Sequence, residues 1–154
     1  MTTILERFTD HTRRIFARHR GRQFLEGAMA ASALVALADG DASLEEGAEV
    51  GRLMRVLDIL RDQNPGEGVE TYLRYIDKLR KDPSAVDEVR AKVKVSAAGD
   101  QEAAALLIVI CHAVSEADGV VRDSEVEEIG RLGRLLSIKS KDAVAMIAPK
   151  QSNV

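Results

Sequence analysis

The apolar residues of this chain recur at helical spacing, and no stretch alternates convincingly between apolar and polar residues with a period of two. Glu46 is followed by apolar residues four, seven and eleven positions later, and Glu125 is followed by them at the same three intervals. Side chains spaced in this way share one face of an α-helix. The pattern therefore predicts an all-α protein, a compact bundle of about seven helices.

The predicted helices group into a short leader and one domain. Residues 1–22 form a basic N-terminal helix, and residues 23–150 form the helical domain. Within the domain we expect a first repeat over about 23–62, two middle helices within 67–97, and a second repeat over about 100–137. The individual helices are predicted over 3–20, 23–38, 43–62, 67–81, 84–97, 100–117 and 123–137, with a short one over 141–148. Glycine and proline residues separate most of them.

A repeated motif organises the domain. Ala-Asp-Gly ends at Gly40 and is followed by Glu46, and the same motif ends at Gly119 and is followed by Glu125, an offset of 79 residues. Sliding 31–57 onto 110–136 also aligns Val35/Val114, Glu49/Glu128, Gly51/Gly130, Arg52/Arg131, Leu53/Leu132, Arg55/Arg134 and Leu57/Leu136. The chain therefore contains an internal pseudo-twofold repeat of a helix–acidic loop–helix unit.

The repeated carboxylates are the candidate functional residues. Helical spacing puts one Asp and one Glu of each copy at the edge of its core-facing stripes. Carboxylates brought together in a partly desolvated site repel unless one is protonated or a cation joins them. An all-oxygen set prefers hard ions, so Ca²⁺, Mg²⁺ or Mn²⁺ are expected before Zn²⁺. The predicted metal ligands are Asp39, Glu46, Asp118 and Glu125, as one shared site or as two weaker half-sites.

Helix capping is the alternative explanation of the same residues. Asp-Gly commonly turns the chain after a helix, and acids near a helix N-terminus are stabilised by its dipole. Ser43 and Glu46 also fit a capping box. In the second copy Arg122 stands in place of Ser43 while Glu125 remains, and this favours the metal interpretation. The spacing of neither loop fits an EF-hand.

Composition narrows the class of protein. The length of 154 residues suits one domain, and the single cysteine, Cys111, excludes an intrachain disulfide and is typical of a reducing compartment. The longest charge-free stretches, Gly27–Ala38 and Ala103–Ser115, are too short for a membrane span and are predicted to be buried core helices. We therefore expect a cytoplasmic protein. No Ser/His/Asp arrangement argues for catalysis, and we expect a protein that is not an enzyme. Cys111 and His112 are expected to pack within a helix bundle.

Charge is distributed unevenly along the chain. Residues 1–22 carry six arginines and two acidic residues, whereas the remainder carries 16 basic and 23 acidic residues. Such a leader is suited to peripheral contact with an anionic membrane surface, to an acidic partner, or to docking on the protein's own acidic body. No nucleic-acid motif or aromatic platform is present, and we expect no nucleic-acid binding.

Several segments together resemble one known family. They are Arg22–Ala28 leading to Ala38–Glu46, Gln101–Ala104 leading to Ala113–Gly119 with Glu125 beyond, and the ending Leu135–Ile138. These segments resemble the TerB family, the tellurite-resistance proteins of bacterial stress operons, and the resemblance covers nearly the whole chain. The resemblance implies a compact, internally pseudo-symmetric helical fold with an acidic region that binds divalent metal. It carries over to the same four carboxylates.

The resemblance also implies a function. TerB-like proteins are associated with resistance to tellurite and other stresses, and act with membrane partners that include an integral membrane protein of the TerC type. Our hypothesis is a non-enzymatic, metal-binding stress-response protein that couples ion binding to association with a partner or membrane complex. The alternative is a helical protein-interaction module, similar to the TerB-like domain of a membrane-anchored co-chaperone, whose acidic loops only cap helices and form a docking face.

Overall fold

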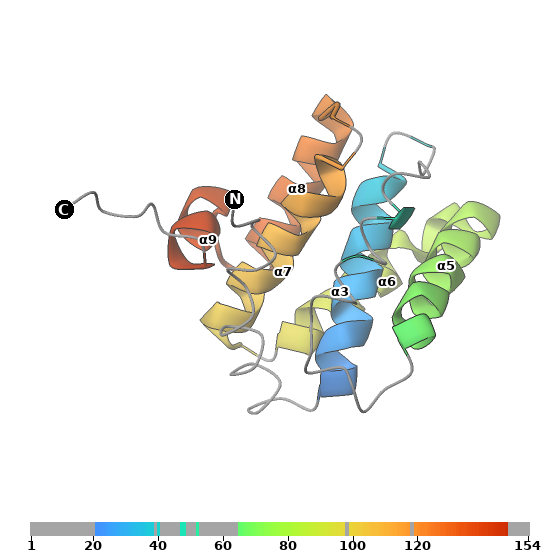
Figure 1. Cartoon of the computed structure of the whole chain (residues 1–154), viewed down its shortest axis with the longest axis horizontal. Coiled ribbons are helices and arrows are strands. Elements are labelled where there is room, and N and C mark those ends of the chain that lie inside the picture. Colours follow the sequence, from blue (N-terminus) through green and yellow to red (C-terminus); the bar gives the residue numbers. More distant parts are fainter. Residues whose placement is uncertain are drawn as a thin grey trace.

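The computed structural model describes residues 21–38, 40, 47–48, 52, 65–97, 99–117 and 119–147. These residues form six α-helices and one 3₁₀ turn, without a strand (Figure 1). The elements are α3 (Gly21–Ala36), α5 (Pro65–Lys81), η2 (Pro83–Ala85), α6 (Val86–Ala97), α7 (Gln101–Ser115), α8 (Asp123–Leu135) and α9 (Ser140–Ile147). The predicted all-α fold is confirmed. The helix predicted over 3–20 lies outside the described residues, and so does the helix predicted over 43–62 apart from Gly47, Ala48 and Arg52.

Two almost wholly buried helices, α3 and α7, form the centre of the bundle. Every residue from Ala103 to Cys111 in α7 is at most 3% exposed, and every residue from Ala28 to Ala36 in α3 is at most 5% exposed. A helix that is apolar on all sides must be surrounded by other elements. Accordingly, α3 packs against α5, α6 and α7, while α7 also packs against α8 and α9. Both segments were expected to be buried core helices, and they are.

The close packing of α3 on α6 depends on a glycine. A Cβ added at Gly27 would lie 1.9 Å from the Ser96 hydroxyl oxygen, far inside van der Waals contact. The Ser96 hydroxyl itself donates to the carbonyl of Val93 at 2.7 Å and so is held in place. Gly27 therefore sets the distance between these two helices.

Side chains and turns define the helix ends near the second repeat. Asp100 caps α7, because its Oδ1 accepts the backbone N–H groups of Glu102 and Ala103 at 2.9 and 3.2 Å. At the other end of the repeat, Ser137 follows α8 with a φ of +59°. The Ile138 N–H donates to the Gly133 carbonyl at 2.8 Å, as in a Schellman motif.

The two central helices run in the same direction. Figure 1 shows that the C-terminal ends of α3 and α7, which lead into the two acidic loops, lie at the same end of the molecule. The two helices also pack directly on one another. The fold therefore brings the described residues that flank both Asp-Gly pairs to one end of the bundle.

Candidate functional site

The two acidic loops begin with the same hydrogen-bonded turn. After α3, backbone N–H groups donate from Leu37 to Ala33, from Ala38 to Val35 and from Gly40 to Leu37, at 3.0, 3.1 and 2.8 Å. After α7, they donate from Glu116 to His112, from Ala117 to Val114 and from Gly119 to Glu116, at 3.0, 3.2 and 3.0 Å. Each bond of the second set joins residues 79 positions beyond those of the first. The duplication seen in the sequence is thus present in the backbone at both helix exits.

A glycine in a left-handed conformation closes each turn. Gly40 has a φ of +93° and Gly119 a φ of +80°. A Cβ at either position would meet no atom within 4 Å, so the backbone conformation, and not lack of space, requires glycine here. The Gly of each Asp-Gly pair is therefore explained by the helix exit alone.

The helices end earlier than predicted, and this changes one argument about the acids. α3 ends at Ala36 and α7 at Ser115, two residues before the predicted ends. Val35 and Val114, one turn before the two Asp residues in sequence, are both 0% exposed. Because the helix stops between each Val and its Asp, helical spacing no longer fixes where the Asp39 and Asp118 carboxylates point.

Of the four predicted metal ligands, one is described by the structure. Glu125 lies in the first turn of α8, whereas Asp39, Glu46 and Asp118 lie outside the described residues. Within the described part of the chain, no group of three or more His, Cys, Asp or Glu residues is placed to hold a metal ion. The metal site therefore stays a prediction, and Glu125 is the one predicted ligand that the structure describes.

Glu125 is a buried carboxylate at the start of α8. Its side chain is 1% exposed, and Oε1 accepts the backbone N–H of Arg122 at 3.2 Å. The Arg122 guanidinium lies 3.9 Å from the same oxygen. This is the Glu half of a capping box, and an arginine side chain, which has no acceptor, cannot supply the other half.

This contact corrects one step of the sequence argument. The replacement of Ser43 by Arg122 was expected to remove the capping box, so that Glu125 would need another role. Half of the box persists, and Glu125 caps α8. The same burial also suits a ligand, since a carboxylate this deep requires donors or cations to balance its charge.

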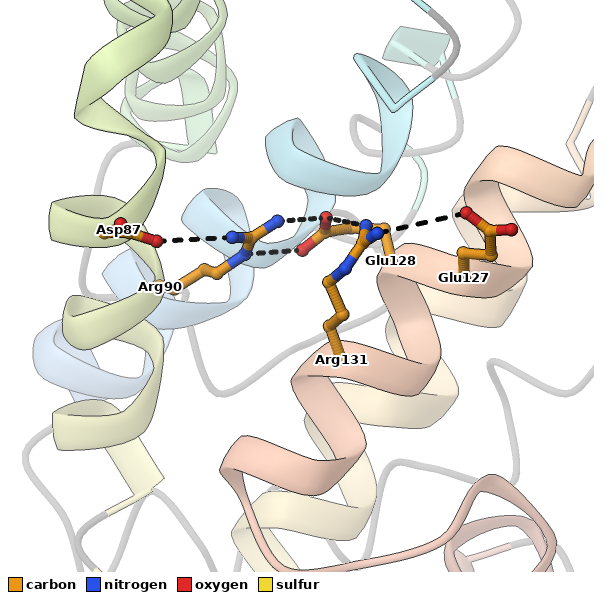
Figure 2. A network of polar contacts seen from close by, with 5 residues as sticks. All are labelled: Asp87, Arg90, Glu127, Glu128 and Arg131. Atoms are coloured by element: carbon orange, nitrogen blue, oxygen red, sulfur yellow. Dashed lines mark hydrogen bonds and ion pairs between the residues drawn. The ribbon is translucent and has the colours of Figure 1, made fainter.

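A second buried carboxylate lies one turn further along α8. Glu128 is 4% exposed and accepts two hydrogen bonds from Arg90 of α6, from Nε to Oε2 at 3.1 Å and from Nη2 to Oε1 at 2.7 Å. Arg131 Nη1 approaches Oε1 at 3.5 Å, and Asp87 and Glu127 extend the network on its two sides (Figure 2). Glu128 holds the pKa of Arg90 above its ordinary value. The network joins α6 to α8.

Sequence reasoning missed this network. Glu128 was recognised only as a position shared with Glu49, although it lies three residues after Glu125 and four before Leu132. That spacing puts it on the buried face of α8 and was the available signal. No local pattern identifies Arg90, because it lies 38 residues away in the chain.

A comparison with models of protein families identifies the family of this chain. The sequence matches the family model described as "Tellurite resistance protein TerB" over residues 25–148. The chain belongs to the TerB family. The match begins in the first turns of α3 and ends just after α9, so it includes both acidic loops of this TerB protein. Comparisons with curated proteins and with solved structures gave no match.

The cysteine and histidine in α7 of the TerB domain are packing residues. Cys111 is 0% exposed, and burial, with a contribution from Glu128, raises the pKa of its thiol to about 12. Burial also lowers the pKa of His112, against the opposing effect of Glu116. Cys111 therefore stays a protonated thiol at neutral pH, and His112 stays neutral, as expected for a helix core.

No helix in the described part of the TerB domain is long and apolar enough to cross a lipid bilayer.

Proposed function

We propose that this TerB protein is a non-enzymatic stress-response protein of the tellurite-resistance type that binds a divalent cation at its acidic loops. The proposed ligands are Asp39, Glu46, Asp118 and Glu125, and their all-oxygen set favours Ca²⁺, Mg²⁺ or Mn²⁺ over Zn²⁺. In this proposal the ion controls association with a protein partner or a membrane complex at the cytoplasmic face.

The matched helix exits are the observation that supports this proposal. Both Asp-Gly pairs follow the same three-bond turn, at the same end of two helices that pack on each other. The second loop leads directly to a carboxylate that is 1% exposed. A shared cation site needs several oxygen ligands at one place, and the matched turns bring both Asp-Gly segments of the sequence to the same end of the bundle.

A second candidate function has an observation of its own. The 3.2 Å bond from the Arg122 N–H to Glu125 supports an interaction module in which the acids cap helices and form a docking face. Under this proposal the protein binds no ion, so the negative charge of Glu125 is not required. A neutral acceptor at position 125 would serve as well.

Thermal unfolding separates the two candidates. Chelator-treated protein is unfolded alone and with Ca²⁺, Mg²⁺, Mn²⁺ or Zn²⁺ added in turn. A cation at about 100 times its dissociation constant adds roughly 2.7 kcal/mol, and therefore raises the midpoint by about 5–10 °C in a domain of this size. The informative variant is Glu125→Gln, because glutamine keeps an oxygen acceptor for the Arg122 N–H but removes the charge.

The matched control is Glu127→Gln, a carboxylate two residues later whose side chain is 69% exposed. Metal binding predicts an ion-dependent rise that Glu125→Gln reduces or removes and Glu127→Gln retains. No rise with any ion would refute the metal proposal and favour the docking face. An equal rise in all three proteins would place the ion away from Glu125.

A further inference from the structure

A groove of about 500 Å³ lies beside the Arg90–Glu128 network, between the C-terminal ends of α3 and α5 and the two helices α6 and α8. Its described lining combines apolar side chains, such as Leu34, Leu79 and Val86, with three arginines and one acidic residue. Ligand sites in proteins are commonly hollows of roughly 300–1,000 Å³ with apolar walls and a few converging polar groups. The groove has this construction.

The acidic residue in the groove, Glu128, holds Arg90 in place. Glu128 is 4% exposed, and each of its two carboxylate oxygens accepts a hydrogen bond from the Arg90 guanidinium group. The planar Arg90 guanidinium is therefore fixed at the groove wall from two sides, by Glu128 and by Asp87 at 3.3 Å. Fixed donors lose little freedom when a ligand arrives, which favours binding.

Arg131 donates fewer hydrogen bonds to the described residues than Arg90 does. Its one hydrogen bond to a described residue is the 3.5 Å contact with Glu128, and its ion pair with Glu127 spans 3.9 Å. A guanidinium carries five N–H groups, so most of those on Arg131 have no acceptor among the residues that the structure describes. The side chain is 48% exposed and also lines the groove. An oxyanion can therefore reach it without displacing Glu128.

We propose that this groove binds a small amphiphilic anion, meaning a carboxylate or phosphate carried on an apolar chain. The acid group lies against Arg131 with Arg90 beside it, and the apolar chain lies over Leu34, Leu79 and Val86. Arginine forks recognise both kinds of oxyanion through paired hydrogen bonds. This inference does not rest on the proposed cation site.

Nuclear magnetic resonance titration of the full chain, in chelator, tests the proposal. Hexanoate and hexyl phosphate are added separately, and hexylammonium serves as the control with the same tail and the opposite charge. We expect saturable shifts of the Leu34, Leu79 and Val86 methyl signals with at least one anion, and none with the ammonium ion. The two anions distinguish a carboxylate from a phosphate ligand. Absence of saturable shifts with both, or equal shifts with hexylammonium, would overturn the proposal.

Paired arginine variants locate the anion. Arg131→Gln should weaken binding by about tenfold or more, the effect of losing a charged hydrogen-bond donor. The control is Arg134→Gln, which removes an exposed arginine of the same helix that lines a different hollow. Equal affinity in the wild-type chain and in Arg131→Gln would overturn the assignment. So would binding that appears only after a divalent cation is added, because the cation would then hold the acid group.

Discussion

Breaking the Arg90–Glu128 pair should lower the free energy of unfolding by more than any surface ion pair in this chain. Glu128 is 4% exposed, the Arg90 side chain is 24% exposed, and two hydrogen bonds join them. The perturbation is a double-mutant cycle with Arg90→Gln, Glu128→Gln and the two changes combined. Such a cycle isolates the interaction between the two side chains from their separate effects.

The expected magnitude follows from the burial of the pair. Removing one partner of a fully buried pair costs about 3–5 kcal/mol, and this pair should fall below that range because Arg90 is partly solvated. Arg131 also remains 3.5 Å from Glu128 as partial compensation. We therefore expect Arg90→Gln to cost roughly 2–3 kcal/mol, with a coupling energy of about 1.5–3 kcal/mol for the charged hydrogen bonds.

Urea and thermal unfolding measure both quantities. At this chain length, a cost of roughly 2–3 kcal/mol lowers the thermal midpoint by about 5–10 °C. The internal control is the Asp77–Lys81 pair of α5, whose side chains are 62% and 76% exposed and whose coupling should be about 0.3–0.5 kcal/mol. A coupling for Arg90 and Glu128 no larger than that of the control would refute the argument that burial strengthens this pair.

Three further predictions concern the packing and titration of single residues. Ser137 has a φ of +59°, a backbone conformation that is strained for serine and not for glycine. Ser137→Gly should therefore raise the free energy of unfolding by roughly 0.5–1 kcal/mol in urea unfolding. A loss of stability would contradict this explanation. Gly27→Ala places a Cβ 1.9 Å from the Ser96 hydroxyl oxygen and should lower the free energy of unfolding by roughly 1–3 kcal/mol, measured by thermal unfolding. Adding Ser96→Gly should restore part of that loss. If the second change restores nothing, the clash with Ser96 is not the cause. The folded-state pKa of His112 is lowered by burial, so its contribution to stability is present above the ordinary value of 6.5 and is lost as pH falls below it. The difference in stability between wild type and His112→Gln should therefore change between neutral and acidic pH, and a constant difference would contradict the shift.

Much of the fold could be predicted because its signals are local. The apolar runs that became α3 and α7 lack charges over most of their length, and such runs belong in the centre of a bundle. Asp-Gly after each run predicted the helix exits, and Gly40 and Gly119 do adopt positive φ. The exact ends were less accurate. Helices α3 and α7 each end two residues before their predicted ends, because the last residues form a turn that the apolar pattern cannot distinguish from helix.

The remainder depended on contacts between distant segments. The Arg90–Glu128 pair joins residues 38 positions apart, and neither has a neighbour that identifies the other. The capping role of Glu125 was judged from the missing serine at position 122, but the bond that matters runs from the backbone N–H, which every residue except proline supplies. Side-chain identity therefore could not exclude this contact.

The two buried carboxylates of α8 have different roles in the account. Glu128 accepts hydrogen bonds from Arg90 and Arg131, so its negative charge is balanced within the protein. Glu125 has the Arg122 backbone N–H and a guanidinium at 3.9 Å, and lies directly after the second acidic loop. This difference is why we place Glu125 in the proposed cation site and Glu128 in the wall of the anion groove.

The most direct test of the proposed cation site is a Mn²⁺ titration of chelator-treated protein followed by electron paramagnetic resonance, in wild type and in Asp118→Asn. The signal of free Mn²⁺ decreases as the ion binds, so the titration gives affinity and stoichiometry together. For a shared site the account predicts one ion per chain, bound much more weakly by Asp118→Asn. For separate half-sites it predicts two ions per chain, of which Asp118→Asn loses one. Free Mn²⁺ that rises in proportion to the amount added, in both proteins alike, would contradict the proposal and leave the acidic loops as helix caps.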